Sequence, residues 1–309
     1  MGKNLTEQLA DTLELPTREP AKTPGEVDIP SSLVQLDVAA RTHAGKVRPN
    51  NEDQFLVARL GRDLEVLASS LPQDEAPLHS RETAYGMVVA DGMGGEAGGE
   101  VASRLAIKTL LDLVIKTPDW LMRLNEELAA EFAKRATRRY READAAIRDE
   151  ARAEPALSRM GTTMTLATSL AADLFVVHVG DSRAYLFRAG QLRQLTRDQT
   201  VVQALVDAGA LTREQAAAHN LRHVLTQALG QSAGELRIEV ERLKLESGDC
   251  LLLCTDGLTD MLTDSEIAGV LAGSDKADDN CRELVARALD AGGKDNVTVI
   301  VARYSFPRI

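Results

Sequence analysis

The segment Tyr85-Gly-Met-Val-Val-Ala-Asp-Gly-Met-Gly-Gly95 joins an apolar run to an aspartate that is followed at once by glycine. The apolar part predicts a buried strand, and Asp91 comes where that strand ends. The pattern recurs twice, because Asp181 follows the apolar run 175–180 and Asp256 follows the run 251–255. A strand end is where a rigid scaffold presents a side chain to a cleft. The sequence therefore predicts three aspartates displayed at strand ends.

Outward from this segment, short apolar runs alternate with turns, and longer stretches show the three- and four-residue spacing of amphipathic helices. Helices are predicted at 96–116 and 120–152, two more within 264–290, and short polar helical pieces over 201–229, broken at Gly209 and near His219. Sequential hairpins outnumber strand-helix-strand units, which favours an α+β fold of packed antiparallel sheets with helices outside. The predicted strands are 34–41, 54–59, 85–90, 162–169, 174–179, 184–188, 191–195, 238–243, 250–254 and 297–303.

Composition places the chain among ordinary globular proteins. It has 309 residues, 44% of them apolar, and a formal net charge of −11, which would repel a nucleic-acid backbone. Its three cysteines have no paired spacing, and no stretch approaches the ~20 apolar residues of a membrane helix. We expect a cytoplasmic monomer that binds neither nucleic acid nor membrane, with a flexible proline-containing tail at 1–33, one domain at 34–309 and a loop at 61–83.

The aspartates also predict a chemistry. Asp followed by Gly is a common turn pair, so one instance alone would indicate only a turn. If several such carboxylates converge, each pair 4 Å apart repels by about 4 kcal/mol at an effective dielectric of 20, so the cluster needs divalent cations. Hard oxygen ligands select Mg²⁺ or Mn²⁺, and two such ions sharing a water could generate a bridging hydroxide for in-line attack on phosphorus.

A phosphate dianion also requires a fixed positive charge, and Arg48 lies five residues before Asp53 in the segment Gly45-Lys-Val-Arg-Pro-Asn-Asn-Glu-Asp53. A lone loop arginine is ordinarily a surface residue. Its spacing from the pair Glu52-Asp53 instead favours a guanidinium that binds two phosphate oxygens. The sequence thus combines candidate metal ligands with a candidate phosphate ligand.

Together these motifs resemble the type-2C, metal-dependent protein phosphatases in their bacterial form, over residues 34 to 304. The resemblance implies a four-layer α/β/β/α sandwich of two antiparallel sheets flanked by helices, and a flap at about 198–229. It also implies hydrolysis of phosphoserine and phosphothreonine on proteins that a serine/threonine kinase has phosphorylated. The motifs that carry it are Gly45-x-x-Arg48-x-x-Asn51-Glu52-Asp53, Val89-Ala-Asp91-Gly-Met-Gly-Gly95, Gly161-Thr-Thr163, Val179-Gly-Asp181-Ser-Arg183, Thr255-Asp-Gly257 and Lys294-Asp-Asn296.

The resemblance assigns roles to individual residues. Arg48 would bind the phosphate, and Glu52 would support the metals directly or through water. Asp181 with Asp256 would help to hold a third, weaker ion, and Asn296 would be a neighbour of the centre. The two-metal centre itself would consist of Asp53, Asp91, Asp256, Asp295 and the backbone carbonyl of Gly92.

Three departures from the family pattern affect the mechanism. Met93 stands where many relatives have a histidine thought to act as general acid, so we expect water to supply the proton. His43 replaces a usual aspartate and is expected to be a bystander, although it is the only histidine within the metal-site motifs. The flap reads Asp198-Gln-Thr200 and His219-Asn-Leu-Arg-His223 instead of Asp-His-Ser and His-Pro-x-x-Asn.

Two other functions remain open from the sequence. The altered flap leaves room for a catalytically weak sensor that binds phosphoproteins, and the site chemistry also suits hydrolysis of small-molecule phosphoesters. The glycine-rich segment 92–99 leads into a helix, but it lacks the Gly-Lys-Ser/Thr and the strand-helix-strand context of a nucleotide-binding loop.

Overall fold

The computed structural model describes residues 33–68, 70, 72, 79–94, 98–116, 126–231 and 234–307, with the backbone alone at 126–128. The predicted tail, apart from Leu33, lies outside these residues. So do the start of the second predicted helix at 120 and, in the connection between the strands at 54–59 and 85–90, residues 69, 71 and 73–78.

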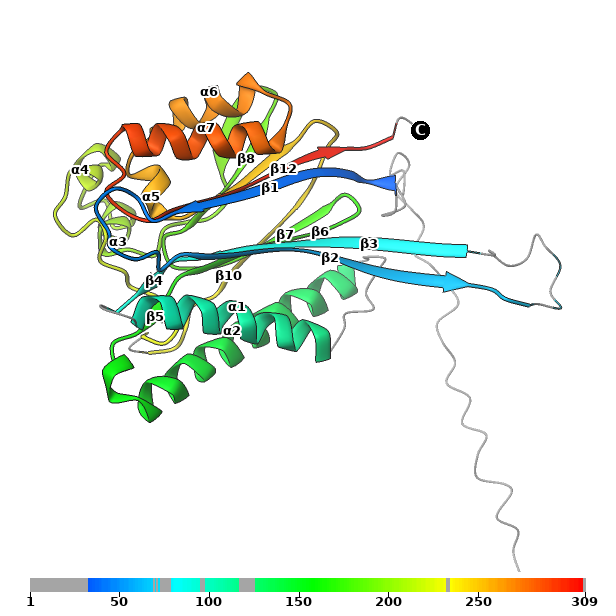
Figure 1. Cartoon of the computed structure of the whole chain (residues 1–309), viewed down its shortest axis with the longest axis horizontal. Coiled ribbons are helices and arrows are strands. Elements are labelled where there is room, and N and C mark those ends of the chain that lie inside the picture. The colour runs from blue at the N-terminus through cyan, green and yellow to red at the C-terminus, as the bar shows by residue number, and fades with distance from the viewer. Residues whose placement is uncertain are drawn as a thin grey trace, which may run out of the picture.

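Two five-stranded antiparallel sheets form the centre of the molecule (Figure 1). A two-stranded sheet of β4 (Gly92–Met93) and β5 (Gly161–Thr162) lies beside them. The first sheet has the order β1 (Gln35–His43), β12 (Val297–Ser305), β11 (Cys250–Cys254), β8 (Arg183–Arg188) and β9 (Gln191–Gln194). The second has the order β10 (Glu239–Lys244), β7 (Asp173–Val179), β6 (Met164–Leu170), β3 (His79–Ala90) and β2 (Gln54–Glu65).

Helices cover both outer faces of this pair of sheets. α1 (Gly98–Lys116) and α2 (Glu126–Ala153) lie against the second sheet, and α6 (Asp264–Gly273) and α7 (Ala277–Asp290) lie against the first (Figure 1). Short helical turns are η2 (Pro155–Leu157), α3 (Val201–Asp207), α4 (Arg213–Ala217) and α5 (Asp256–Thr259). The predicted four-layer α/β/β/α sandwich is therefore confirmed. Within the described ranges, no helix is both long enough and apolar enough to cross a bilayer.

The strict alternation of buried side chains in the central strands creates the four layers. In β3, Met87 and Val89 point into the core between the sheets, whereas Val88 and Ala90 point into the core under α1 and α2. In β11, Leu252 packs under α6 and α7 while its neighbours face the other sheet. Successive side chains of a strand point to opposite faces, so continuous apolar runs are what a strand buried on both faces requires.

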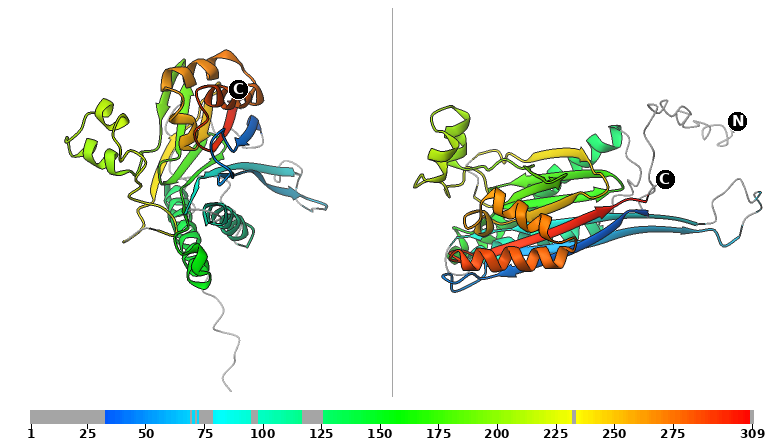
Figure 2. Two further views of the ribbon diagram at one scale, coloured as in Figure 1. Left: turned by 60° about the vertical axis from the view of Figure 1, so that its left-hand side comes forward. Right: turned by 90° about the horizontal axis from the view of Figure 1, so that it is seen from above.

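The predicted strands 54–59 and 85–90 are too short, and the predicted loop 61–83 between them is too long. β2 and β3 continue to Glu65 and from His79 as a paired ribbon that projects beyond the other strands (Figures 1 and 2). Residues 61–65 are exposed, so their polar sequence carries no burial pattern, and backbone pairing holds them. A cross-strand pair of Arg81 and Asp63, 2.8 Å apart, adds to the pairing.

Two other predictions concern turns and the flap. The hairpin between β8 and β9 is confirmed, with Ala189 and Gly190 at φ values of 50° and 79°, as a tight turn of this kind requires. The helical pieces predicted over 201–229 are α3 and α4, with Gly209 between them at a φ of 70°. Residues 218–229 are turns and isolated bridges instead of helix. Figure 2 shows α3 and α4 standing apart from the sandwich.

Candidate metal centre

The carboxylates singled out from the sequence gather at one end of the sandwich. Asp53 comes just before β2 and Asp91 just after β3, while Asp256 begins α5 directly beyond β11. Asp295 precedes β12, and Asp181 follows β7. The negative charges of the other four aspartates all act on Asp91 and, after its burial, raise its pKa well above the usual value. Segments far apart in the sequence thus place five acidic groups in one electrostatic cluster.

Asp53 is the most enclosed of these groups, with only 2% of its surface exposed. The hydroxyls of Thr255 and Thr298 donate to its Oδ2, at 2.8 and 2.7 Å. Its Oδ1 is buried and accepts no hydrogen bond from the described part of the chain. Burial raises the pKa of Asp53 to about 7, and the negative charges of Asp256 and Asp295 act in the same direction. A buried carboxylate oxygen without a donor is strongly disfavoured unless a cation satisfies it.

The backbone around Asp91 is fixed by two neighbouring threonines. The amide of Asp91 donates to Thr163 Oγ1 at 3.0 Å, and its carbonyl accepts from the Thr163 amide at 2.9 Å and from Thr162 Oγ1 at 2.7 Å. The side chain is therefore displayed from a rigid strand end. The predicted motif Gly161-Thr-Thr163 serves to hold Asp91 in place.

Glu52 lies against the glycines that follow Asp91. A Cβ on Gly99 would come within 2.6 Å of Glu52 Oε2, and one on Gly92 would come within 2.7 Å of the Glu52 carbonyl. Only glycine permits such an approach, which brings the Gly92 backbone to the acidic cluster. Burial raises the pKa of Glu52, while the positive charge of Arg48 lowers it.

Asp256 and Asp295 complete the cluster on the side of the first sheet. Asp256 Oδ1 is buried and finds no hydrogen-bond partner among the described residues. Asp295 Oδ1 accepts from the Asn296 amide at 2.9 Å, and its Oδ2 faces Arg48 Nη2 at 2.6 Å. The Arg48 side chain keeps 55% of its surface exposed, so it stands at the rim of the cluster with room to meet a ligand.

Asn296 ties the loop that carries Arg48 and Glu52 to the start of β12. Its Oδ1 accepts from the Glu52 amide at 2.7 Å, and its Nδ2 donates to the carbonyls of Ala44 and Asn50 at 2.9 and 2.8 Å. Gly45, with a φ of 78°, lets this loop pass the Asp295 backbone, because a Cβ there would overlap the Asp295 carbonyl oxygen. Asn296 is thus a positioning residue for the centre.

Asp181 is buried beside the start of the flap, with 9% of its surface exposed. Burial raises its pKa well above the usual value, the charges of Asp256 and Asp198 add to the rise, and Arg183 opposes it. Arg183 itself pairs with both oxygens of Asp198, at 2.6 to 3.2 Å. The unusual Gln199 anchors the flap, since its Oε1 accepts from the Gly180 amide at 2.9 Å.

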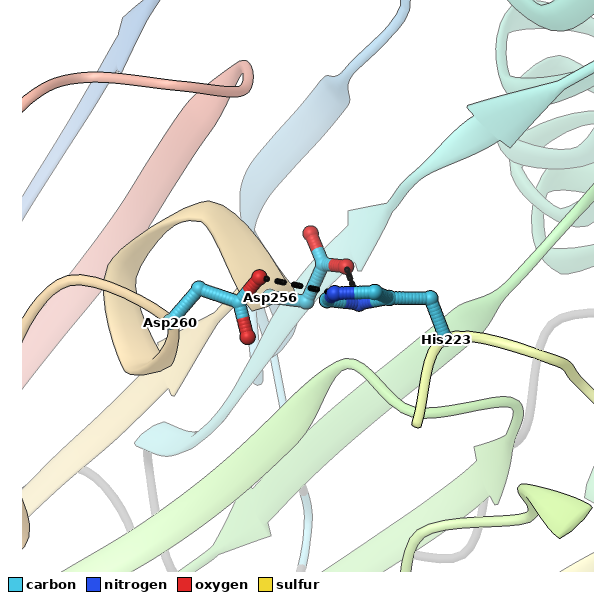
Figure 3. Close-up of side chains that lie close together, drawn as sticks. All are labelled: His223, Asp256 and Asp260. Atoms are coloured by element: carbon cyan, nitrogen blue, oxygen red, sulfur yellow. Dashed lines mark ion pairs between the residues drawn. The ribbon is translucent and has the colours of Figure 1, made fainter. Parts of the chain in front are cut away.

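Two histidines, His43 in the metal-site motifs and His223 in the flap, lie in different surroundings in the structure. His43 lines a groove between β1 and α7, together with Phe55 and Leu289, and its Nδ1 accepts from the Gly45 amide at 2.9 Å. His223, from the flap, instead lies beside Asp256 (Figure 3). Among the described histidines, the one that meets the acidic cluster therefore comes from the flap and not from the metal-site motifs.

The donor set fits hard divalent cations. It offers carboxylate oxygens and a backbone carbonyl, and the buried Oδ1 atoms of Asp53 and Asp256 lack donors from the described chain. Mutual repulsion and burial raise the pKa of Asp53, Asp91 and Asp181, which is the electrostatic state expected where positive charge is needed. Such a site suits Mg²⁺ or Mn²⁺.

Comparison with known proteins agrees with this geometry. The family described as Protein phosphatase 2C matches residues 67–295. The serine/threonine protein phosphatase PstP of Mycobacterium tuberculosis is 37% identical over 270 residues, which cover 86% of this chain.

The chain belongs to the protein phosphatase 2C family.

Other members extend the comparison. The serine/threonine phosphatase stp of Listeria monocytogenes is 31% identical over 84% of this chain and 93% of its own length. The solved catalytic domain of PstP in complex with two manganese ions is 34% identical, with a TM-score of 0.68, covering 88% of this chain and 99% of that one. The Streptococcus agalactiae serine/threonine phosphatase gives a TM-score of 0.72 at 29% identity. This 2C-family chain spans 45% of the length of full PstP.

Three residues of this 2C-family site were not found from the sequence. Thr255 and Thr298 bind Asp53 from the ends of β11 and β12, and His223 reaches Asp256 from the flap. Thr255 stands inside a quoted motif, and its position directly before Asp256 was the available signal. Thr298 lies within an apolar strand and His223 within a divergent flap, so neither has a local pattern that indicates its contact.

Proposed function

We propose that this chain is a metal-dependent phosphatase that hydrolyses phosphoserine and phosphothreonine on proteins phosphorylated by a serine/threonine kinase. The observation that carries the proposal is the cluster of Asp53, Asp91 and Asp256, in which Asp53 Oδ1 and Asp256 Oδ1 are buried without a hydrogen-bond partner in the described chain, next to the exposed guanidinium of Arg48. Family membership and the names of the relatives, which are serine/threonine phosphatases, support the same conclusion.

In this proposal two Mn²⁺ or Mg²⁺ ions bind at the acidic cluster. Glu52 supports the cluster beside Gly92, and Asp181 with Asp256 holds a third, weaker ion. When bound, the ions supply a nucleophilic hydroxide from water at neutral pH and polarise the phosphate. The ligands of the two-ion centre are Asp53, Asp91, Asp256, Asp295 and the carbonyl of Gly92.

The chain's own residues orient the substrate. Arg48 binds the phosphate dianion through its planar guanidinium. In the free chain this guanidinium pairs with Asp295. Asn296 and the glycine at 45 hold the arginine loop against β12, so Arg48 keeps its place when the phosphate arrives. Met93 cannot donate a proton, and His43 faces the groove beside α7, so neither protonates the departing serine or threonine oxygen; we assign that role to solvent water.

The experiment is turnover of a phosphothreonine peptide after chelation and after restoring metal. Activity should vanish in EDTA and return with Mn²⁺ or Mg²⁺, and Asp256→Asn should remove bound metal and activity together. Asp112→Asn is the matched control, because Asp112 is an exposed carboxylate that pairs with Lys108 on α1. Full turnover after exhaustive chelation would refute the metal-dependent mechanism.

The same assay separates the competing functions. A phosphoprotein sensor would bind the peptide with metal present but turn it over at the background rate. A small-molecule phosphoesterase would favour phosphorylated metabolites over the peptide in side-by-side kcat/KM measurements. The retention of every carboxylate in the cluster favours an active enzyme, because a sensor does not need a buried oxygen such as Asp53 Oδ1.

A further inference from the structure

A groove runs along the outer edge of the first sheet, between β1 and α7. Its volume is about 450 Å³, and residues 40–43 of β1 line one side of it. The apolar side chains that line it from other elements are Val285, Ala286 and Leu289 of α7 and Phe55 of β2. Phe55 keeps 37% of its surface exposed, so a large apolar surface is open to a ligand here.

β1 offers a strand edge to this groove. Among the described strands it pairs with β12 alone, because it stands at the end of the first sheet. An edge strand presents N–H and C=O groups with which another chain can pair. Proteins bind extended peptides by adding a strand to such an edge, where main-chain hydrogen bonds give affinity and pockets for alternate side chains give specificity.

The groove is continuous with the proposed phosphate site. α7 lies along β1, and both extend to the end of the sandwich where α5 lies (Figure 1). His43 lines the groove two residues before Gly45, and the backbone of Gly45 passes directly against the carbonyl of Asp295. Asp295 is in turn the partner of Arg48.

The spacing along β1 sets how far a substrate must extend to reach the groove. Consecutive Cα atoms are about 3.8 Å apart, so the Cα atoms of His43 and Gly45 are separated by at most about 7.6 Å. An extended peptide covers that distance in about two residues. A phosphothreonine held by Arg48 therefore places the residues two and three positions away beside the groove.

The charges at the groove favour an uncharged segment of the peptide. Arg41 and Arg282 both line it, but each binds Asp278, at 2.7 and 2.6 Å. Arg282 also pairs with Asp279 at 3.3 Å. Because these arginines are balanced by neighbouring aspartates, a charged peptide side chain of either sign gains little. The apolar walls gain most from an apolar side chain.

We propose that this groove binds the substrate segment next to the phosphorylated residue, as an extended strand added to β1. It selects proteins that carry an apolar side chain two or three positions from the phosphoserine or phosphothreonine, and Phe55 and Ala286 contact that side chain. The inference rests on the proposed function and adds a substrate class to it. A phosphorylated metabolite has no such segment, so the groove favours protein substrates.

The test compares two phosphothreonine peptides, which carry either leucine or alanine at the second and third positions on both sides of the phosphothreonine. Wild type should have a kcat/KM about tenfold higher for the leucine peptide, through a lower KM, because the groove removes the additional apolar surface from water. Ala286→Glu places a charge among the apolar walls and should reduce this preference to about twofold or less. Ala145→Glu, at an exposed position of α2, is the matched control and should keep the preference.

Methylating the flanking amide nitrogens of the leucine peptide one at a time tests the added strand. In a paired strand, the N–H groups of alternate residues face the partner. Every second methylation should therefore raise KM about fivefold, as the loss of one hydrogen bond implies, and the methylations between should raise it less. The same KM for all the methylated peptides would overturn strand addition to β1.

Other results would overturn the groove itself. Equal kcat/KM for the two peptides in wild type would do so, and so would a preference that survives in Ala286→Glu. Turnover of p-nitrophenyl phosphate, which has no flanking chain, reports the state of the metal centre in each variant. If Ala286→Glu slows all three substrates by one factor, the change acts on that centre and the proposal fails. A wild-type dimer that Ala286→Glu dissociates in sedimentation would assign the groove to a second copy of the chain and also overturn it.

The outcome is separable from that of the proposed function. Hydrolysis of both peptides with equal kcat/KM would reject the groove and leave the phosphatase proposal intact. If neither peptide is hydrolysed, the phosphatase proposal fails, and fluorescence anisotropy of the two labelled peptides then decides on the groove. Tighter binding of the leucine peptide to wild type, lost in Ala286→Glu, would support the groove, and equal binding would reject it.

Discussion

The buried carboxylate of Asp53 should make the metal-free protein less stable as the pH rises toward neutrality. Its pKa is about 7 in the folded chain, against an ordinary value of 3.8. The folded chain therefore holds a proton that the unfolded chain releases. The free energy of unfolding consequently falls as the pH rises from about 4 to about 7. The full effect is about 4 kcal/mol, and the part between pH 5 and pH 7.5 is about 2.5 kcal/mol.

Urea unfolding of the chelated chain at pH 5 and pH 7.5 measures this loss. Asp53→Asn removes the titrating group, so the pH dependence of the variant should differ from that of wild type by about 2.5 kcal/mol. The comparison of wild type with Asp53→Asn is needed because buried His178 changes the free energy of unfolding in the opposite direction. Burial lowers the pKa of His178, so acid destabilises the fold through this residue in both proteins. Asp63→Asn, an exposed carboxylate paired with Arg81, should behave like wild type.

Saturating Mn²⁺ should reverse the order of stabilities, because the ion binds the deprotonated carboxylate and its affinity rises with pH. The loaded wild-type chain should then be more stable at pH 7.5 than at pH 5, and Asp53→Asn should lose most of the stabilisation by Mn²⁺. If wild type and Asp53→Asn show the same pH dependence when chelated, Asp53 does not titrate in this range and the argument from its burial fails.

Three further outcomes are expected. Arg48→Ala should raise KM for a phosphothreonine peptide about tenfold or more, as the loss of a charge-assisted contact implies, with bound Mn²⁺ unchanged; an unaltered KM would make Arg48 a surface residue. His43→Ala should change kcat by the same small factor on the peptide and on p-nitrophenyl phosphate, and a loss of ~10²-fold or more on the peptide alone would identify it as the general acid. Asn296→Ala should lower the free energy of unfolding by about 2 to 3 kcal/mol through its three lost hydrogen bonds and should weaken Mn²⁺ binding. A free energy of unfolding within about 0.5 kcal/mol of wild type would show that other contacts hold the loop.

The sequence predicted those parts of the structure that depend on patterns of residues close together in the chain. β11 has the predicted limits 250–254, because its five residues are all buried and bounded by polar positions. Asp91, Asp181 and Asp256 could be singled out because each adjoins both a buried strand and a glycine.

Contacts between distant segments were not accessible in the same way. Thr298 reads as one more β-branched residue of a strand, and its bond to Asp53 exists only because β12 and the start of β2 meet 245 residues apart in the sequence. His223 lies in a flap that departs from the family pattern, so its contact with Asp256 has no local sign. In the outer half of the β2–β3 ribbon the end of β2 is exposed and β3 is at most half-buried, which is why backbone pairing there leaves no trace in the hydrophobic pattern.

The pairing of β1 with β12 has a consequence for biosynthesis. Gln35 pairs with Ser305, and β12 also separates β1 from β11, so the first sheet stays open until the last described strand has left the ribosome. Asp295 and Thr298 arrive with that strand. A nascent chain therefore exposes Asp53 and Asp91 to solvent without a complete set of ligands, and contacts of such long sequence separation form slowly. Nascent chains from which β12 has not yet emerged should consequently remain unable to cleave phosphoesters, whatever the supply of manganese.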